Sequence, residues 1–339
     1  MVKPLIFFDP YPRTKEMVLS SNLEKKLKKI SRLKTYFGKR APINIVESIL
    51  PDVEIIVGQT SMDKRRLKLS KKLKAIINVK GNWENNIDYK EAYKKGIYVL
   101  SAAPAMAPAV AEACIGYAIA LSRNTYANHN DFVVAKEKYG IEGNRNSYNL
   151  YDAKVGFIGF GNLAKSLIKL LKPFNCKISS YDPWLTKQEF DKFNVRKTNL
   201  NSILKNNQFI FILSGVTKDN INFLNRTKLK MIKKDSSVIL ISRAEVVDFE
   251  AFVELAEKKY FRAAIDVFPE EPVPLDSSLR KKKNIIFNSH LAGGMYFSYM
   301  KIRDMMFDDI SRILNNKKPR NLEHAIPDKA KLRIDKWKK

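Results

Sequence analysis

Cysteine is scarce in this chain. Its 339 residues include 2 cysteines, Cys114 and Cys176, with no C-x-x-C pair and no histidine cluster beside them. A disulfide framework or a structural zinc module needs more of these ligands, so both are excluded and we expect no metal site. Free thiols persist in reducing compartments, which favours a cytoplasmic location.

Long uninterrupted apolar runs are also missing. The first one, residues 5–8, is shorter than the ~7–15 residues of a signal-peptide core. Residues 102–122 carry no Lys, Arg or Asp and are about as long as a membrane span. They contain Pro104, Pro108 and Glu112, however, and a carboxylate near the bilayer centre costs about 2–3 kcal/mol. We therefore expect a proline-rich loop followed by a buried helix, and no membrane partner.

Acidic residues are few relative to basic ones. The chain has 35 Asp and Glu against 62 Lys and Arg, which gives a formal charge of +27 and a pI of about 9.8. Such values are typical of proteins that bind nucleic acids or anionic membranes. The basic residues are spread over separate segments, and the chain is rich in Asn and Ile, which A/T-rich codons encode together with Lys. We therefore interpret the excess as a surface property and expect no specific nucleic-acid partner; the alternative predicts saturable binding with a steep salt dependence.

What the chain does contain is a regular alternation of short apolar runs and amphipathic segments. Its 45% apolar residues suffice for a full core, and its length suggests two domains. The pattern predicts strands at residues 5–8, 53–57, 75–79 and 97–100, and a second, cleaner series at 155–158, 177–181, 209–213, 238–241, 263–266 and 284–287. Helical patterns lie between these strands, and a last one covers residues 296–314. This alternation predicts an α/β fold with parallel sheets.

A glycine-rich turn follows the first strand of the second series, in the sequence V-G-F-I-G-F-G-N-L-A. Gly159 permits the tight turn, Gly161 lets the backbone approach a pyrophosphate, and Ala164 is small enough for helix–strand packing. Asn162 and Leu163 open the helix, whose free N–H groups and partial positive charge suit phosphates. The pattern predicts a dinucleotide site.

Asp182 strengthens this prediction, because it stands at the end of the next expected strand. A carboxylate there binds both ribose hydroxyls and repels a 2′-phosphate, and Pro183 and Trp184 supply no arginine for one. NAD is therefore favoured over NADP. The alternative is a bare glycine turn with Asp182 as a strand-end cap.

Three further segments, residues 241–248, 263–272 and 288–294, follow strands of the same series. Ligands of open α/β sheets bind beyond the carboxyl ends of the strands. These segments bring an arginine that can clamp a carboxylate, a glutamate that can hold a histidine, and a histidine that can exchange a proton. Taken singly, each is more simply a salt bridge, a loop charge or a satisfied polar residue.

Together these motifs resemble the D-isomer-specific 2-hydroxyacid dehydrogenases, the superfamily of phosphoglycerate dehydrogenase, glyoxylate reductase and formate dehydrogenase. The resemblance runs from about residue 53 to residue 314. It implies two Rossmann-like domains, one flavodoxin-like and one NAD-binding, with a cleft between them. The implied parts are a discontinuous substrate (catalytic) domain of residues 1–108 plus 292–325, an NAD-binding domain of residues 109–291 and a basic tail of residues 326–339. It also implies a homodimer formed through the NAD-binding domain, including the helix that carries Glu112.

The resemblance implies an activity and a role for each motif. The expected protein is an NAD-dependent oxidoreductase that interconverts a D-2-hydroxy acid and a 2-oxo acid by hydride transfer. Arg243 would bind the substrate carboxylate and 2-oxygen, and His290, paired with Glu271, would be the general acid and base. Asp266 would hold the nicotinamide carboxamide. The alternative is an NAD-sensing, non-catalytic interaction protein of the same fold, as in the corepressors of this superfamily.

Further contacts are implied at both ligands. The expected cofactor contacts also include Thr217, Ser242 and Gly293. A substrate-binding loop is expected at Gly81, Asn82 and Trp83.

The sequence departs from the family pattern where substrate is chosen. Trp83 stands where a glycine is usual, and two interpretations stay open: it covers a bulky or apolar substrate side chain, or it is wedged between domains. The loop at residues 58–60 lacks the arginine that phosphoglycerate dehydrogenases use for the substrate phosphate. This disfavours phosphoglycerate as substrate, unless a Lys from elsewhere takes the place of that arginine. Leu213-Ser214-Gly215 replaces the usual His-x-Pro after the third strand of the nucleotide domain.

Overall fold

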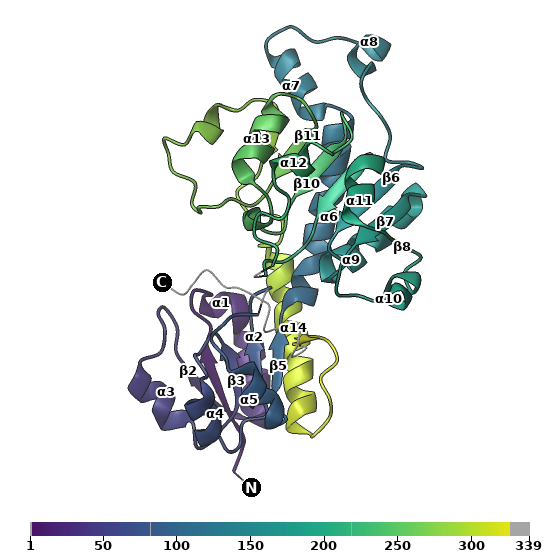
Figure 1. The fold of residues 1–339 in the computed structure, drawn as a ribbon. Coiled ribbons are helices and arrows are strands. Elements are labelled where there is room, and N and C mark those ends of the chain that lie inside the picture. The colour runs from purple at the N-terminus through teal and green to yellow at the C-terminus, as the bar shows by residue number, and fades with distance from the viewer. Residues whose placement is uncertain (1, 82, 218, 326–339) are drawn as a thin grey trace. The chain divides into compact units, whose positions relative to one another are not determined.

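The computed structural model describes residues 2–81, 83–217 and 219–325 (Figure 1). Within this part the chain divides into two compact units. The first takes the described residues of Met1–Met106 and Gly294–Lys339, and the second takes Ala107–Gly293. The first unit is therefore built from both ends of the chain. Asn82 and the expected basic tail, residues 326–339, lie outside the described residues.

The first unit is a sheet with helices on its two faces. Its elements are β1 (Leu5–Asp9), α1 (Lys15–Val18), α2 (Ser21–Ile30), β2 (Arg32–Thr35), α3 (Ile43–Ile49), β3 (Val53–Gly58), α4 (Lys64–Leu69), β4 (Ala75–Asn78), α5 (Tyr89–Lys94), β5 (Tyr98–Ser101), the start of α6 (Ala103–Ser122), α14 (Tyr296–Leu314) and β13 (Glu323–His324). The sheet order is β13-β5-β4-β3-β1-β2, and only β13 runs antiparallel to its neighbour. From β2 to β5 this is the flavodoxin-like order.

Alternate residues of β1 point to opposite faces of this sheet, as the strand geometry requires. Ile6 and Phe8 pack in a cluster with Leu23 of α2 and Ile302 of α14. Phe7 packs in the other cluster, which the apolar residues of α3, α4 and α5 complete. The C-terminal helix α14 therefore shares a core with the N-terminal strands.

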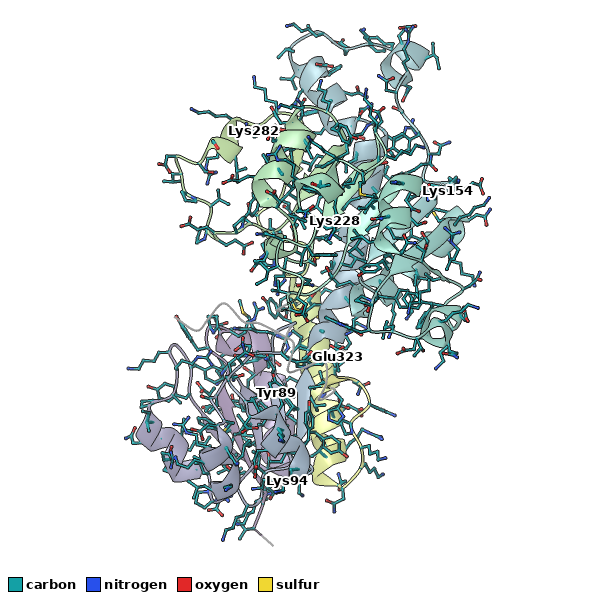
Figure 2. The ribbon with its side chains drawn as sticks, viewed as in Figure 1. Tyr89, Lys94, Lys154, Lys228, Lys282 and Glu323 are labelled. Atoms are coloured by element: carbon teal, nitrogen blue, oxygen red, sulfur yellow. The ribbon has the colours of Figure 1, made fainter. Side chains whose placement is uncertain are left out.

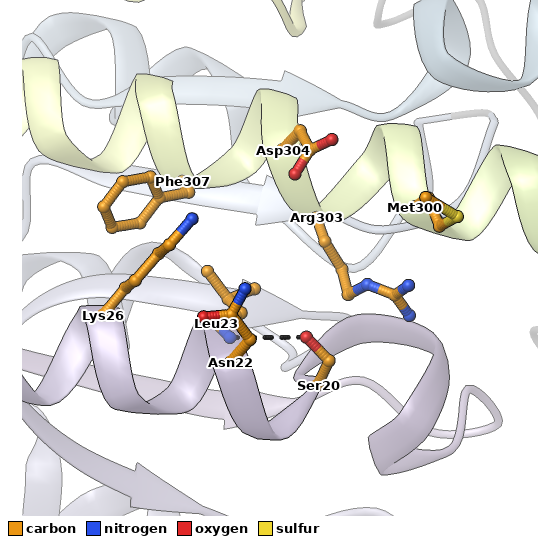
Figure 3. A pocket seen from close by; sticks show the side chains of 8 residues that line it. All are labelled: Ser20, Asn22, Leu23, Lys26, Met300, Arg303, Asp304 and Phe307. Atoms are coloured by element: carbon orange, nitrogen blue, oxygen red, sulfur yellow. Dashed lines mark hydrogen bonds between the residues drawn. The ribbon is translucent and has the colours of Figure 1, made fainter.

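Polar contacts also fasten α14 to the N-terminal helices. Arg303 is 8% exposed and donates from Nη1 to the carbonyl oxygen of Glu16 at 2.6 Å. Lys26 of α2 points to the ring of Phe307, with Nζ 5.6 Å from the ring centroid (Figure 3). A groove of about 350 Å³ lies between the two helices here. These contacts explain how residues from both chain ends form one unit.

The second unit is a seven-stranded parallel sheet. Its elements are the rest of α6, α7 (Thr125–Val133), α8 (Gly140–Asn144), β6 (Lys154–Ile158), α9 (Asn162–Leu171), η1 (Lys172–Phe174), β7 (Lys177–Tyr181), α10 (Lys187–Asp191), β8 (Arg196–Lys197), α11 (Leu200–Asn206), β9 (Phe209–Ile212), α12 (Arg226–Leu229), β10 (Ser237–Leu240), η2 (Ala244–Val246), α13 (Phe249–Glu257), β11 (Arg262–Ile265), η3 (Ser278–Lys281) and β12 (Ile285–Phe287). The two units confirm the predicted α/β class with predominantly parallel sheets.

The strand order of this sheet is β12-β11-β10-β9-β6-β7-β8. From β6 the chain proceeds outward to β7 and β8, then returns to the other side of β6 and continues through β9 to β12. The order therefore reverses between β6 and β9, and such a switch point leaves a crevice at the carboxyl ends of the strands. The glycine turn after β6 stands at this point.

The expected loop over the prolines between residues 102 and 109 is wrong. Helix α6 begins at Ala103, and Pro108 lies inside it. Pro104 falls in the first turn, where no backbone N–H is needed, and Pro108 forfeits one hydrogen bond of the helix. By length and composition α6 is the one helix in the described residues that is able to cross a membrane, but 50% of that stretch is buried inside the protein.

Basic side chains occur on both units, as their scatter in the sequence predicts. Lys94 belongs to the first unit, whereas Lys154, Lys228 and Lys282 belong to the second (Figure 2). The charge is therefore not gathered on one element. Both cysteines are free thiols, as expected.

Candidate active site

The turn after β6 can only be made with glycine at its first position. Gly159 has φ +97°, and a Cβ there would lie 2.7 Å from the backbone nitrogen of Ser214. Its N–H donates to the carbonyl oxygen of Tyr181 at 2.8 Å. The turn is thus held between the ends of β7 and β9, at the switch point of the sheet.

Gly161 caps α9 and leaves open space beside the helix start. Apart from the adjoining residues, no described atom lies within 4 Å of the position that a Cβ would occupy, and no side-chain hydrogen bond caps the helix. The N–H groups of the first helical turn have no partner inside a helix, and Asn162 and Leu163 carry two of them. Ala164 is fully buried against the sheet. These features fit a dinucleotide pyrophosphate at the helix N-terminus.

Asp182 follows β7 and lies beside the same turn. Its Oδ2 accepts from the backbone N–H of Phe160 at 3.0 Å, and its Oδ1 accepts from that of Trp184 at 3.0 Å. A carboxylate has about four acceptor positions, so each oxygen keeps one for a ribose hydroxyl. The half-buried Asp182 is thus hydrogen-bonded to the glycine turn of the predicted dinucleotide site.

Three buried hydroxyls follow β9 and β10 and have no hydrogen-bond partner among the described residues. They belong to Ser214, Thr217 and Ser242. Buried polar groups are nearly always satisfied, so unsatisfied ones call for a ligand or water. Their place beyond the strand ends agrees with a nucleotide site there.

Asp266, directly after β11, is 1% exposed. Its Oδ1 accepts from Nδ2 of Asn288 at 2.7 Å and from the N–H of Leu291 at 3.1 Å, and its Oδ2 accepts from the N–H of Ala292 at 3.4 Å. Burial raises the pKa of Asp266, and these hydrogen bonds and the nearby His290 oppose the rise. The Tyr117 hydroxyl also hydrogen-bonds with Asp266, so four groups meet this carboxylate.

Glu271 and His290 form a hydrogen-bonded pair. Oε2 of Glu271 lies 2.7 Å from Nδ1 of His290, and Oε1 accepts from the N–H of Phe268 at 2.9 Å. Because an ionised carboxylate only accepts, Nδ1 is the donor and Nε2 is left for exchange with a ligand. The two side chains are 43% and 36% exposed, so the ring is accessible. This is the arrangement of a general acid and base with its orienting carboxylate.

Arg243 lies between β10 and η2 and is half-buried. Its Nη1 donates to the carbonyl oxygen of Ser242 at 2.6 Å. A guanidinium carries five N–H donors in a planar fork, which suits a carboxylate.

Most of the predicted residues therefore lie in the second unit, beyond the carboxyl ends of its strands. The residues that follow its strand ends are Gly159, Gly161, Asn162, Leu163, Asp182, Thr217, Ser242, Arg243, Asp266 and His290, with Glu271 in the loop after β11 and Gly293 at the end of the unit. Among the described residues no group of three His, Cys, Asp or Glu side chains is placed to hold a metal ion.

The expected substrate loop belongs to the first unit. Gly81 follows β4, and Met106 Sδ would lie 3.5 Å from a Cβ at Gly81. Trp83 is 4% exposed and packs in a core cluster of its own unit with residues such as Ile87. Lys80 and Glu84 form a half-buried ion pair on either side. The indole thus packs into the unit beneath its loop.

Sequence reasoning missed Asn288 and the free hydroxyl of Ser214. Asn288 stands two residues before His290 and directly after β12. This position at a strand end is a signal in the sequence for a site residue. Its partner Asp266 follows a different strand, so only the paired sheet shows that they meet.

The chain is similar to known proteins over most of its length. Residues 115–292 match the family described as D-isomer specific 2-hydroxyacid dehydrogenase, NAD binding domain. A glyoxylate reductase of Pyrococcus horikoshii is 27% identical over 266 residues, which cover 76% of this chain and 79% of that protein. A hydroxypyruvate reductase of Thermotoga maritima is 30% identical over 250 residues, covering 72% and 79%. The crystal structure of a phosphoglycerate oxidoreductase from Rhizobium etli is similar with a TM-score of 0.85 at 30% identity, covering 96% of this chain and 99% of that one.

Proposed function

The chain belongs to the D-isomer specific 2-hydroxyacid dehydrogenase family, and from this premise we propose that it interconverts a D-2-hydroxy acid and a 2-oxo acid with His290 as general acid and base. Family membership supports NAD-dependent activity on small hydroxy or oxo acids. The observation that carries the residue assignment is the 2.7 Å contact between Oε2 of Glu271 and Nδ1 of His290, in the same unit as the glycine turn.

NAD is held in the second unit. The residues proposed to bind it are Gly159, Gly161, Asn162, Leu163, Asp182, Thr217, Ser242, Asp266 and Gly293. When bound, NAD supplies or accepts the hydride of the reaction. Asp182 would select NAD over NADP, because its carboxylate repels a 2′-phosphate. Asp266 would accept from the amide of the carboxamide, in competition with the Tyr117 hydroxyl.

The acid–base step follows from the pair at the end of β12. In reduction, Arg243 binds the substrate carboxylate with its planar fork and polarises the 2-oxo group. His290 donates a proton from Nε2 to the oxygen at that carbon, while Glu271 holds the ring through Nδ1. In oxidation Nε2 takes the proton back. Holding reactants in such an arrangement is worth about 7–11 kcal/mol of the barrier in favourable cases.

The first unit would serve as the substrate domain. We propose that the loop with Gly81 and Asn82 contacts the substrate, and that Trp83 supports this loop from the core. The loop at residues 58–60 has no arginine of its own, but Nη1 of Arg40 donates to the carbonyl oxygen of Gln59 at 2.6 Å, so a guanidinium does stand at this loop. Small 2-oxo acids are the substrate class that these residues suit, and the substrate panel includes acids with and without a phosphate.

Activity is tested with the purified protein and a panel of 2-oxo acids, with NADH and NADPH compared side by side. We expect NADH oxidation with at least one acid, and its loss in the His290→Ala variant. Binding of NADH with no turnover of any acid would instead favour the non-catalytic, NAD-sensing interpretation. Full activity of the variant would remove His290 from the mechanism.

We further propose that the protein is located in a reducing cytoplasm. We also propose that it forms a homodimer through the second unit. Helices α7 and α8 bury none of their residues, although they and their connection carry large apolar side chains. Phe132, Val133, Val134, Tyr139 and Ile141 are 64%, 67%, 57%, 76% and 80% exposed. Apolar patches of this kind mark interfaces. Light scattering should give twice the chain mass for the natural protein and a monomer for Phe132→Asp combined with Ile141→Asp; a natural monomer contradicts the proposal.

A further inference from the structure

Asn288 connects three parts of the candidate site. Its Nδ2 donates to Oδ1 of Asp266 at 2.7 Å, and its backbone N–H donates to the carbonyl oxygen of Ile265 at 2.9 Å. Its own carbonyl oxygen accepts from the N–H of His290 at 3.0 Å. One residue therefore links the ends of β11 and β12 to the backbone of the proposed acid and base.

The carboxylate of Asp266 continues this link on the far side of His290. It accepts from the N–H groups of Leu291 and Ala292 at 3.1 and 3.4 Å. Asn288 before the histidine and two N–H groups after it thus converge on one carboxyl group that is 1% exposed. Burial raises the pKa of Asp266, and the hydrogen bond from the Asn288 amide is the largest of the influences that oppose this rise. The same hydrogen bonds orient the carboxylate.

The backbone held in this way has an unusual conformation. His290 has φ +55°, in the left-handed region that residues with a Cβ seldom adopt. Such conformations persist only where the surroundings hold them, and they are common at functional sites. Glu271 holds the ring of His290 through Nδ1, and its other oxygen accepts from the N–H of Phe268. The backbone is held by the group of hydrogen bonds around Asp266.

We propose that Asn288 is a positioning residue for the proposed acid–base reaction. By donating to Asp266 it keeps that carboxylate turned toward the N–H groups that follow His290. The histidine then presents its ring from a fixed backbone, with Nε2 directed to the substrate. This proposal rests on the proposed role of His290 and adds a residue that does not itself touch the reacting atoms.

The test uses two substitutions and a matched control. Asn288→Ala removes the donor and the side chain, whereas Asn288→Leu keeps a side chain of similar size without a donor. Asn284→Ala is the control, because Asn284 precedes the same strand β12 and its Nδ2 donates to the carbonyl oxygen of Glu257 at 2.9 Å. The control therefore removes one side-chain hydrogen bond of similar length at the opposite end of the strand.

We expect kcat for reduction of the active 2-oxo acid to fall about 10- to 100-fold in both Asn288 variants, because small misplacements of a catalytic group have effects of this size. The dissociation constant for NADH from fluorescence should rise by less than kcat falls, because only the contact of Asp266 with the cofactor is loosened and the residues at the glycine turn are untouched. The Asn284 variant should keep its kcat.

Three results would overturn the proposal. They are a kcat in the Leu variant within twofold of the control, an equal loss of kcat in the control, or a loss of NADH affinity that matches the loss of kcat, which would place the effect on cofactor binding through Asp266 rather than on the position of His290. If Asn288→Ala does not fold, the Leu variant decides. His290→Ala is measured in parallel: an active His290 variant refutes the proposed function, whereas an inactive one with unaffected Asn288 variants refutes only the role of Asn288.

Discussion

The two glycines of the turn after β6 should respond differently to the same substitution. In Gly159→Ala the new methyl group meets the backbone nitrogen of Ser214 at 2.7 Å, and the residue has φ +97°. In Gly161→Ala no described atom outside the adjoining residues lies within 4 Å of the new methyl group, and the backbone angles of −90° and −155° are allowed for alanine. The first change therefore disturbs the fold, whereas the second only enters the space beside the helix start.

The expected magnitudes follow from these surroundings. Alanine at the φ of Gly159 costs about 1–3 kcal/mol, which at about 2–4 °C per kcal/mol for a domain of this size lowers the Tm by about 2–12 °C. Gly161→Ala should leave the Tm within about 2 °C. A methyl group forced against the bound pyrophosphate costs about 1–3 kcal/mol by analogy with overpacking, so the Kd for NADH should rise roughly 5- to 150-fold.

The assay combines thermal unfolding without cofactor and NADH titration by fluorescence. The natural protein and both variants are measured at the same ionic strength. An unchanged Tm in Gly159→Ala would refute the conformational argument for that position. An unchanged Kd together with an unchanged Tm in Gly161→Ala would show that the cofactor does not approach the backbone there.

Two further substitutions test the site, and a thiol reagent tests the burial of the two cysteines. Glu271→Gln keeps an acceptor but loses the charge that faces Nδ1 of His290, so kcat should fall about 10- to 100-fold with little change in the KM for NADH; an unchanged kcat would contradict the pairing. Asp182→Ala should weaken NADH on the order of 10-fold and NADPH less, so that the preference for NADH shrinks in side-by-side titrations. Burial raises the pKa of the Cys114 thiol, and it raises that of Cys176 to about 11, so a thiol reagent at pH 8 should modify the folded protein slowly and both cysteines after unfolding; rapid modification of the folded protein would contradict this.

Much of the fold could be read from local patterns. The strands of both sheets were predicted wherever an apolar run marked them, and β6, β7 and β9 were placed to within a residue. The unpredicted strands are short or exposed: β2 (Arg32–Thr35) has no buried residue, and β8 and β13 have two residues each. Such strands are set by their neighbours rather than by their own sequence.

The start of the alanine-rich helix α6 was not predicted from the local pattern. Its prolines predicted a loop, because proline disfavours helix interiors. In the structure α6 nevertheless starts at Ala103, and its apolar residues pack into the core of the second unit. Tertiary packing thus outweighed a local propensity.

The sequence by itself determined the glycine turn, the acidic residue after the next strand, and the order of arginine, glutamate and histidine, because these depend on residue type and on spacing along one strand–loop–helix unit. It also determined the family, through the same motifs. Only the tertiary structure decided three other features: the hydrogen bond from Asn288 to Asp266, the left-handed backbone of His290 and the burial of Trp83. They arise where separate strands and loops meet, and contacts between segments distant in sequence leave no periodic pattern that a single chain displays.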